Sequence, residues 1–138
     1  MVDRISEERR SWNMSRIQGR DTTPELVLRK ALHRAGYRYR LRSDLFGKPD
    51  LALRRYNAVI FVHGCFWHRH KRCKFAYMPK SRVSFWQDKF DANVARDDRV
   101  RRRLRRQGLK VIVIWECQLR RDVTSVINRI QRRLVPAE

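Results

Sequence analysis

The chain has 138 residues, a mass of 16.8 kDa, a formal charge of +20 and a pI near 11.4. This length fits one domain and excludes two independent cores, so residues 1–138 are expected to form a single domain. Apolar residues make up 42% of the chain, and no apolar run approaches the roughly 20 residues that span a bilayer. Residues 1–10 lack the apolar segment of a secretory signal, so we expect a cytoplasmic protein that does not bind membranes.

The positive charge favours a polyanionic partner. Lys and Arg total 34 against 14 Asp and Glu, and most of the excess is arginine, whose planar fork suits phosphate. Nucleic acid is the most abundant intracellular polyanion, although an anionic membrane surface or an acidic protein would also match this charge. Charge alone does not choose between DNA and RNA, or between an enzyme and a basic component of a large ribonucleoprotein.

The first third of the chain predicts an arm, a helix and a short strand. Residues 1–20 are polar and basic and are interpreted as an arm able to order on a ligand such as DNA. Thr23 is expected to cap a helix that begins at Pro24 and stops at Gly36. The apolar positions of this helix are Leu26, Leu28, Ala31, Leu32 and Ala35. Residues 37–41 favour a short strand.

The middle of the chain predicts a hairpin followed by an irregular segment. Residues 51–53 and 58–62 are apolar strands, and residues 54–57 read as the connection between them. A turn at residues 47–50 precedes the first strand. Residues 63–79 show no regular period and are crowded with His, Cys and aromatic residues.

The last third predicts a long helix, a buried strand and a closing helix. The long helix is expected from Ser84 to Gly108, with an apolar stripe formed by Phe85, Trp86, Phe90, Val94 and Leu104. Residues 110–116 form a continuous apolar run typical of a strand buried on both faces. Residues 121–134 predict one amphipathic helix. The resulting order of helix, strands, helix, strand and helix indicates an α/β domain with a mixed sheet.

The cysteines and two nearby histidines predict a zinc site. Three cysteines without a partner for the third argue against a disulfide framework. Zinc favours four thiolate and imidazole ligands, a set that Cys65, Cys73 and Cys117 complete with one histidine. His70 reaches this set better than His68, which lies closer to Cys65. The alternative is three buried free thiols, which fits Cys117 best when that residue is taken alone.

A carboxylate and two histidines predict a divalent-cation site. Asp50 stands at the start of one hairpin strand, so it should lie near the end of the other strand, beside the Val62 carbonyl and His63. Mg²⁺ prefers such oxygen ligands, and His63 or His68 could transfer a proton near neutral pH. Glu25 could orient a histidine or a water molecule. Each residue alone has an ordinary structural explanation, but together on a basic chain they favour a nuclease.

Several short motifs resemble those of the very short patch repair (Vsr-type) mismatch endonucleases. The most specific is His63-Gly-Cys-Phe-Trp-His68 with His70 and Cys73. It is accompanied by Asn13-Met14, Arg20-Asp21-Thr22, Glu25, Pro49-Asp50, Phe85-Trp86, Lys89, Asn93-Val94, Arg96-Asp97 and Trp115-Glu-Cys117. The resemblance covers about residues 10 to 121.

This resemblance implies a fold, a reaction and a catalytic set. The fold would be like that of the type II restriction endonucleases, with a mixed sheet flanked by helices and a structural zinc site. The reaction would be a Mg²⁺-dependent nick in double-stranded DNA, 5′ to the thymine of a T·G mismatch left by deamination of 5-methylcytosine. Asp50 and the Val62 carbonyl would hold Mg²⁺. His68, oriented by Glu25, would assist the attacking water, and His63 would support the scissile phosphate.

The resemblance also assigns the zinc ligands and the DNA contacts. Cys65, His70, Cys73 and Cys117 would bind structural Zn²⁺. Phe66, Trp67 and Trp86 would wedge into the base stack from the major groove and Met14 from the minor groove, while Lys89 and Asn93 would face the mismatch. The resemblance further implies a monomer that binds nucleoid DNA, with mismatch-repair proteins as possible partners.

Two departures keep other functions open. Restriction enzymes usually carry an acidic-x-Lys pair on the second strand, whereas this chain reads Phe61-Val62-His63. The spacer from His70 to Cys73 is one residue longer than the family pattern leads us to expect. The competing hypotheses are a restriction-type nuclease that cuts matched DNA and a zinc-stabilised nucleic-acid-binding module without enzymatic activity.

Overall fold

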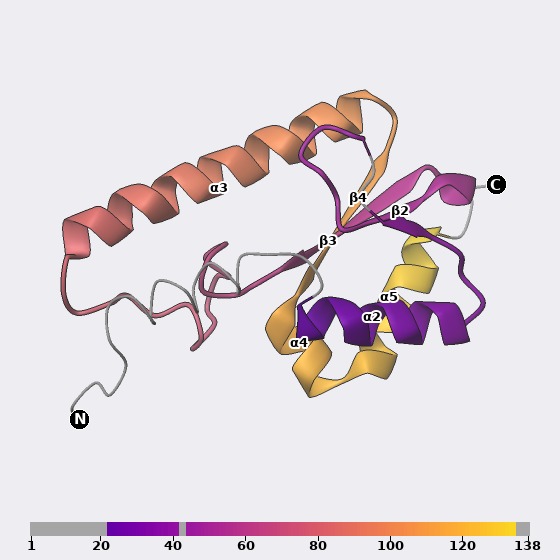
Figure 1. The fold of residues 1–138 in the computed structure, drawn as a ribbon, viewed down its shortest axis with the longest axis horizontal. Helices are drawn as coiled ribbons and strands as arrows, with labels where there is room; N and C mark the ends of the chain where they lie inside the picture. The colour runs from indigo at the N-terminus through magenta and orange to yellow at the C-terminus, as the bar shows by residue number, and fades with distance from the viewer. Residues whose placement is uncertain (1–21, 42–43, 135–138) are drawn as a thin grey trace.

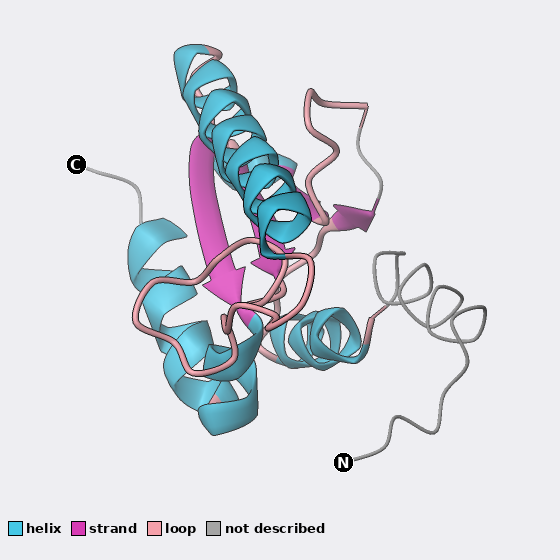
Figure 2. Ribbon diagram, turned by 90° about the vertical axis from the view of Figure 1, so that its left-hand side faces the viewer, coloured by secondary structure: helices cyan, strands magenta, loops and turns pink. Residues whose placement is uncertain are grey.

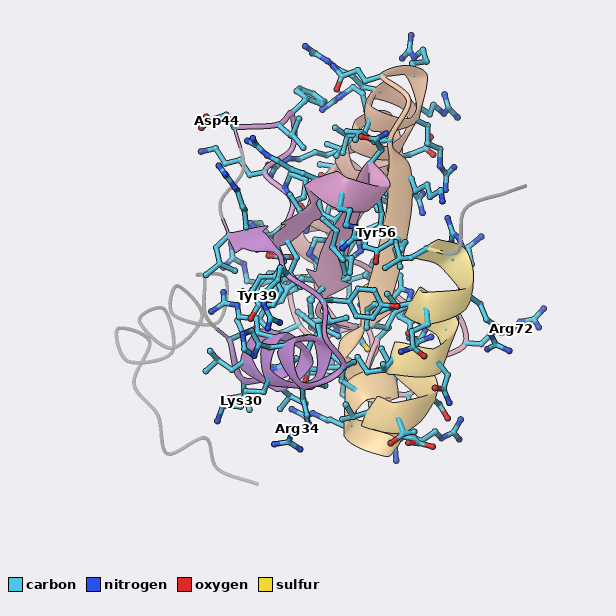
Figure 3. The ribbon with its side chains drawn as sticks, turned by 90° about the vertical axis from the view of Figure 1, so that its right-hand side faces the viewer. Lys30, Arg34, Tyr39, Asp44, Tyr56 and Arg72 are labelled. Carbon is cyan, nitrogen blue, oxygen red and sulfur yellow. The ribbon has the colours of Figure 1, made fainter. Side chains whose placement is uncertain are left out.

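The computed structural model describes residues 22–41 and 44–134. The basic arm expected for residues 1–20, which includes Met14, lies outside these residues. Within them, no helix is long and apolar enough to cross a membrane. Cationic side chains such as Lys30 and Arg34 extend outward from helix α2 (Figure 3).

A mixed sheet forms the centre of the described part of the chain. Its strand order is β1 (Arg40–Leu41), β2 (Leu51–Leu53), β3 (Ala58–His63) and β4 (Lys110–Trp115). The pairs β1–β2 and β2–β3 are antiparallel, whereas β3 and β4 are parallel. The parallel pair requires a long crossover, which contains the 24-residue helix α3 (Val83–Arg106). The mixed α/β architecture predicted from the sequence is confirmed.

Helices cover both faces of this sheet (Figures 1 and 2). Ile60 and Ile112 face a core shared with α2 (Thr23–Arg34), α4 (Glu116–Arg121) and α5 (Val123–Leu134). Their neighbours Val59 and Val111 face the opposite side, where they pack with residues of α3. This alternation along adjacent strands explains why both strands read as continuous apolar runs.

The predicted hairpin connects β2 to β3. Residues 54–56 form a single 3-10 turn, η1 (Arg54–Tyr56), and Asn57 closes it in the left-handed conformation at φ 50°. Asn tolerates this conformation better than most residues other than glycine. The strand expected at residues 37–41 is shorter than predicted, because only Arg40–Leu41 pairs with β2.

Helix α2 begins one residue earlier than predicted, with Thr22 rather than Thr23 at the cap position. Pro24 occupies the first turn and Gly36 follows the helix at φ 96°, as the sequence suggests. Leu28 and Leu32 are buried completely, whereas Leu26 is 42% exposed and does not belong to the buried stripe.

Helix α3 also begins one residue early, at Val83, after Arg82 in the left-handed conformation. The predicted apolar stripe is partly wrong, because Phe85 and Val94 are each 45% exposed. Val100 joins Phe90 and Leu104 in the core instead. The helix covers the sheet only along its second half, so the first half needs no continuous apolar face.

The single closing helix predicted for residues 121–134 is wrong in its first part. Residues 116–121 form a separate helix, α4. Asp122 follows with an extended backbone at φ −163° and separates α4 from α5. The Asp122 carboxylate accepts hydrogen bonds from the Ser125 hydroxyl at 2.8 Å and the Ser125 amide at 3.3 Å. The bond from the Ser125 amide pairs a backbone donor in the first turn of α5, as a side-chain cap does.

Leucines on the two sides of α2 provide a test of this packing. Leu32→Ala should lower the free energy of unfolding by about 2–5 kcal/mol, because it leaves a cavity at a fully buried position. Leu26→Ala, on the same helix but exposed, should change it by less than about 0.5 kcal/mol. Urea unfolding monitored by tryptophan fluorescence would measure both, and equal losses would contradict the burial described here.

Candidate active site and metal centre

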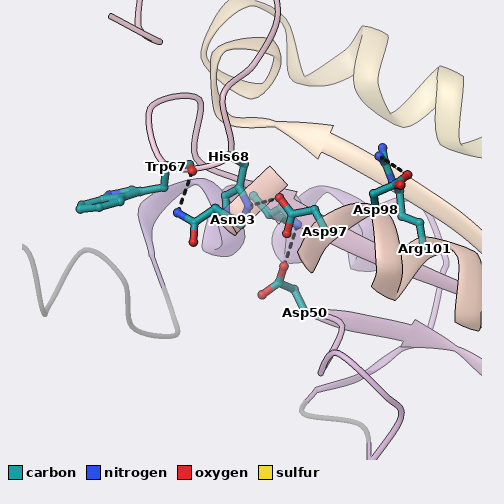
Figure 4. Close-up of polar contacts among 8 residues, drawn as sticks. Asp50, Trp67, His68, Asn93, Asp97, Asp98 and Arg101 are labelled. Carbon is teal, nitrogen blue, oxygen red and sulfur yellow. Dashed lines mark hydrogen bonds and ion pairs between the residues drawn. The ribbon is translucent and has the colours of Figure 1, made fainter. Parts of the chain in front are cut away.

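The β2–β3 hairpin brings Asp50 to the end of β3. Leu51 pairs with Ile60, so the residue before β2 lies beside the residues that follow Ile60. The Val62 amide donates a hydrogen bond of 2.7 Å to Asp50 Oδ2 (Figure 4). The expected proximity of Asp50 to Val62 and His63 is therefore seen, and the backbone of β3 fixes the direction of the carboxylate.

Two carboxylates share this end of the hairpin. Burial raises the pKa of Asp50 to about 7; the Val62 hydrogen bond opposes this rise and the neighbouring Glu25 carboxylate adds to it. Glu25 is only 6% exposed and accepts a hydrogen bond of 3.0 Å from Arg29, four residues further along α2. Oxygen atoms from the buried Glu25 and the half-buried Asp50 are a donor set that suits a hard divalent cation.

The predicted histidines meet beside Asp50. The rings of His63 and His68 stack with centroids 3.9 Å apart. His68 Nδ1 lies 2.7 Å from Asp97 Oδ2, and one ligand atom from each of His63, His68 and Asp97 lies within 4.8 Å of the other two. Burial lowers the pKa of His63 to about 3, and His68 acts in the same direction, so His63 is neutral at physiological pH.

Asp97 is the residue of this site to which the sequence assigned no role. It appears in the Arg96-Asp97 motif, but its position on a helix far along the chain from His68 gives no sign of contact. A carboxylate at Nδ1 fixes the orientation of an imidazole and leaves Nε2 available for proton transfer. The helix α3 therefore supplies the group that orients His68.

A second cluster contains the four predicted zinc ligands. One ligand atom from each of Cys65, His70, Cys73 and Cys117 lies within 4.8 Å of the other three, and Cys117 Sγ is 3.3 Å from His70 Nδ1. Sulfur ligands of a tetrahedral zinc ion are about 3.8 Å apart, so these positions fit such an ion after small adjustments. His70, and not His68, belongs to the cluster, which agrees with the sequence prediction.

The chemistry of this cluster suits a soft cation. Burial raises the pKa of the Cys65 thiol to about 12, so the thiol stays protonated unless a positive charge lies beside it. Three sulfurs and an imidazole drawn together have few other means of compensating thiolate charge, whereas a zinc ion would favour the thiolates. The longer spacer between His70 and Cys73 is accommodated with Arg72 in the left-handed conformation at φ 58°.

The parallel strands place both clusters at the same edge of the sheet. His63, the last residue of β3, pairs with Trp115, the last residue of β4. Trp115 contacts the His63 ring at 5.2 Å and stacks on His70 at 4.2 Å, so it separates the two clusters. Cys117 lies in the first turn of α4, directly after β4.

The aromatic residues form a third group next to the histidines. Phe66 lies 5.1 Å from Trp67, 5.6 Å from Trp86 and 5.2 Å from the buried Phe90 between ring centroids. The Asn93 side chain donates a hydrogen bond of 3.1 Å to the Trp67 carbonyl. The Trp67 ring points away from the polar cluster (Figure 4).

A groove of about 1290 Å³ connects these groups. Its described lining includes carboxylates, imidazoles, aromatic rings and cations from α2, α3, the hairpin and the residues after β3. The predicted site residues among them are Glu25, Asp50, Val62, His63, Cys65, Phe66, Trp67, His68, Lys89 and Asn93. A single open groove with cations on its walls can receive a polyanion beside a buried acid–base cluster.

Comparison with known proteins identifies the family. A family model described as DNA mismatch endonuclease Vsr matches residues 2–74. The chain belongs to the Vsr family. It is a DNA endonuclease, and DNA is its partner. The hypothesis of a binding module without enzymatic activity is thereby set aside.

Three relatives show how far the similarity extends. The type II nicking enzyme V.XorIIP of Xanthomonas oryzae pv. oryzae is 43% identical over 138 residues, covering 99% of this chain and all of the relative. The type II nicking enzyme V.NmeAIP of Neisseria meningitidis is 39% identical and covers 99% of both chains. The DNA mismatch endonuclease Vsr of Escherichia coli is 41% identical over 87% of this Vsr-family chain and 77% of its own length.

The two histidines on either side of Arg69 give a test of the metal centre. We expect the purified protein to carry about one equivalent of zinc, and His70→Ala to retain less than about half. His68→Ala should keep its zinc, because His68 faces Asp97 instead. Elemental analysis by mass spectrometry measures both variants, and full zinc in His70→Ala would contradict the ligand assignment.

Proposed function

We propose that the chain nicks double-stranded DNA 5′ to the thymine of a T·G mismatch, in a reaction that depends on Mg²⁺. The observation that carries this proposal is the meeting of Asp50, His63, His68 and Asp97 in one groove beside an aromatic cluster. The Escherichia coli relative is named a DNA mismatch endonuclease, and two other relatives are named nicking enzymes. Such mismatches arise when 5-methylcytosine deaminates, so the reaction would begin very short patch repair.

Asp50 and the Val62 carbonyl are the proposed magnesium ligands. The proximity of the half-buried Asp50 to the buried Glu25 supports this, because a divalent cation would offset the charge that burial disfavours. Bound Mg²⁺ would supply Lewis-acid polarisation of the scissile phosphate. Glu25, beside Asp50, would orient the attacking water.

The two histidines have different proposed roles in catalysis. His68 would accept a proton from the attacking water at Nε2 while Asp97 holds Nδ1 and stabilises the imidazolium that forms. His63 is neutral and buried against His68, so it would support the scissile phosphate as a hydrogen-bond donor without competing for the proton. This division follows from the burial of His63 and the partial exposure of His68.

The aromatic cluster would recognise the mismatch by insertion. Phe66, Trp67 and Trp86 would enter the base stack from the major groove and Met14 from the minor groove. A T·G pair weakens local stacking, so wedging a ring between its base steps costs less than in matched DNA. Lys89 and Asn93 would face the mismatch; Lys89 Nζ lies 5.9 Å from the Trp67 ring centroid and Asn93 holds the Trp67 carbonyl.

The architecture is proposed to be that of the restriction endonucleases, stabilised by zinc at Cys65, His70, Cys73 and Cys117. The antiparallel hairpin that carries Asp50, followed by a parallel strand across a long helix, supports this assignment. One active site suffices for a nick in one strand, so we propose that the enzyme acts as a monomer. Mismatch-repair proteins are its proposed partners.

A panel of labelled duplexes tests the substrate. We expect Mg²⁺-dependent nicking of a T·G duplex at least about a hundredfold faster than nicking of matched or other mismatched duplexes, because insertion is least costly at the mismatch. Denaturing gel electrophoresis with each strand labelled locates the cut. Equal cleavage of matched DNA would favour the second candidate, a restriction-type nicking enzyme, to which the names of two relatives point.

Asp50→Asn tests the catalytic assignment. It keeps the shape of the side chain but removes the charge, so nicking should fall roughly a thousandfold or more while duplex binding is retained or tightened. Asp44→Asn, an exposed change of the same kind, should leave both unchanged. Single-turnover rates and fluorescence anisotropy measure the two properties, and loss of binding in Asp50→Asn would argue against a metal ligand.

A further inference from the structure

Tyr77 is an exposed aromatic residue that no role described above explains. The residue is 61% exposed, yet its ring centroid lies 5.0 Å from that of Phe66, a member of the aromatic cluster. Tyr77 and Trp67 both line the groove that contains Asp50 and His68. Tyr77 therefore extends the aromatic cluster along the lining of this groove.

Arg69 fixes the backbone that carries this ring. Its guanidinium donates hydrogen bonds to the carbonyls of Tyr77 at 3.0 Å, Ala76 at 2.9 Å and Phe66 at 3.3 Å. The same guanidinium stacks over the Phe90 ring at 3.9 Å. Charge-assisted bonds to three carbonyls and a buried ring join the segment 76–77 to the cluster and to α3.

This arrangement is poorly explained by stability alone. A residue that is 61% exposed contributes little buried area, so the core gains little from holding Tyr77 in this position. A fixed and exposed ring beside a basic groove is instead a surface prepared for a base, since every base has a face on which an aromatic ring stacks. Preorganisation by Arg69 would lower the ordering cost on binding.

We propose that Tyr77 is a fourth DNA-stacking residue of the aromatic cluster and that Arg69 positions it. This inference rests on the proposed insertion of the cluster into mismatched DNA. Tyr77 would stack on a base unstacked at or beside the mismatch, while Arg69 would act through Tyr77 and its neighbours without touching DNA.

The first experiment compares Tyr77 variants in binding to a T·G duplex without a divalent metal, by fluorescence anisotropy. Tyr77→Leu keeps apolar packing on Phe66 but removes the stacking face, so Kd should rise roughly five- to hundredfold. Tyr77→Phe keeps the face and should bind within about twofold of the unchanged chain. Unchanged binding by Tyr77→Leu would overturn the proposal.

Phe85 provides the matched control. It is 45% exposed and packs at 5.3 Å against Trp86, but it is not among the described residues that line the groove. Phe85→Leu should bind within about twofold of the unchanged chain. An equal loss in Phe85→Leu and Tyr77→Leu would overturn the proposal, because exposure would then account for the effect without the groove.

Arg69 is tested against Arg82, a second arginine in the left-handed conformation that stacks on an aromatic ring, at 4.4 Å from Phe85. Arg69→Met should weaken DNA binding as Tyr77→Leu does, and Arg69→Lys should restore the binding in part. Arg82→Met removes the same charge and should change Kd less than about twofold. The double variant Arg69→Met/Tyr77→Leu should bind more tightly than the two separate losses predict, because the residues act together. Strict additivity, with zinc content and melting temperature unchanged, would overturn the positioning role.

Trp67→Ala separates failure of this inference from failure of the proposed function. If Trp67→Ala weakens binding and Tyr77→Leu does not, only the inference fails. If neither changes the preference for T·G over matched DNA, the insertion proposal fails and takes the inference with it.

Discussion

The position of β3 between two different neighbours determines where the functional groups meet. On one side it pairs antiparallel with β2, so the residue before β2 lies at the end of β3. On the other side it pairs parallel with β4, so the ends of both strands lie at one edge. Asp50, His63 and the start of α4 therefore converge, although they are separated by up to half of the chain. A change of register in either pair would separate them.

Charge is distributed unevenly between this edge and the rest of the molecule. The chain has a formal charge of +20, but the groups gathered at this edge are carboxylates, imidazoles and thiols, which are buried or half-buried. Cations on the outside attract a polyanion, whereas carboxylates and thiols are the side chains that ligate cations. The long-range field and the local chemistry thus have opposite signs, which suits a site that brings a phosphate and a metal ion together.

Most of the helices and strands, and most of the residues in each cluster, could be predicted from the sequence. The continuous apolar runs at 58–62 and 110–116 are a signal carried by neighbouring residues in the chain. The hairpin register alone placed Asp50 beside Val62. The contact of His68 with Asp97 had no such signal, because it depends on how α3 crosses the sheet. The break at Asp122 was missed because its effect is a local cap at Ser125 that competes with a continuous helical pattern. Leu26, Phe85 and Val94 show that helical spacing reveals an apolar face but not how far it is covered.

The parallel pairing of β3 and β4 has a consequence for synthesis of the enzyme. Cys117, the fourth member of the thiol and imidazole cluster, follows β4, and β4 itself lies beyond the whole of α3. A nascent polypeptide that ends before β4 contains the hairpin with Asp50. It lacks both the strand that pairs with β3 and the Cys117 thiol. The parallel edge on which both clusters lie is therefore assembled only after α3 and β4 have both been synthesised.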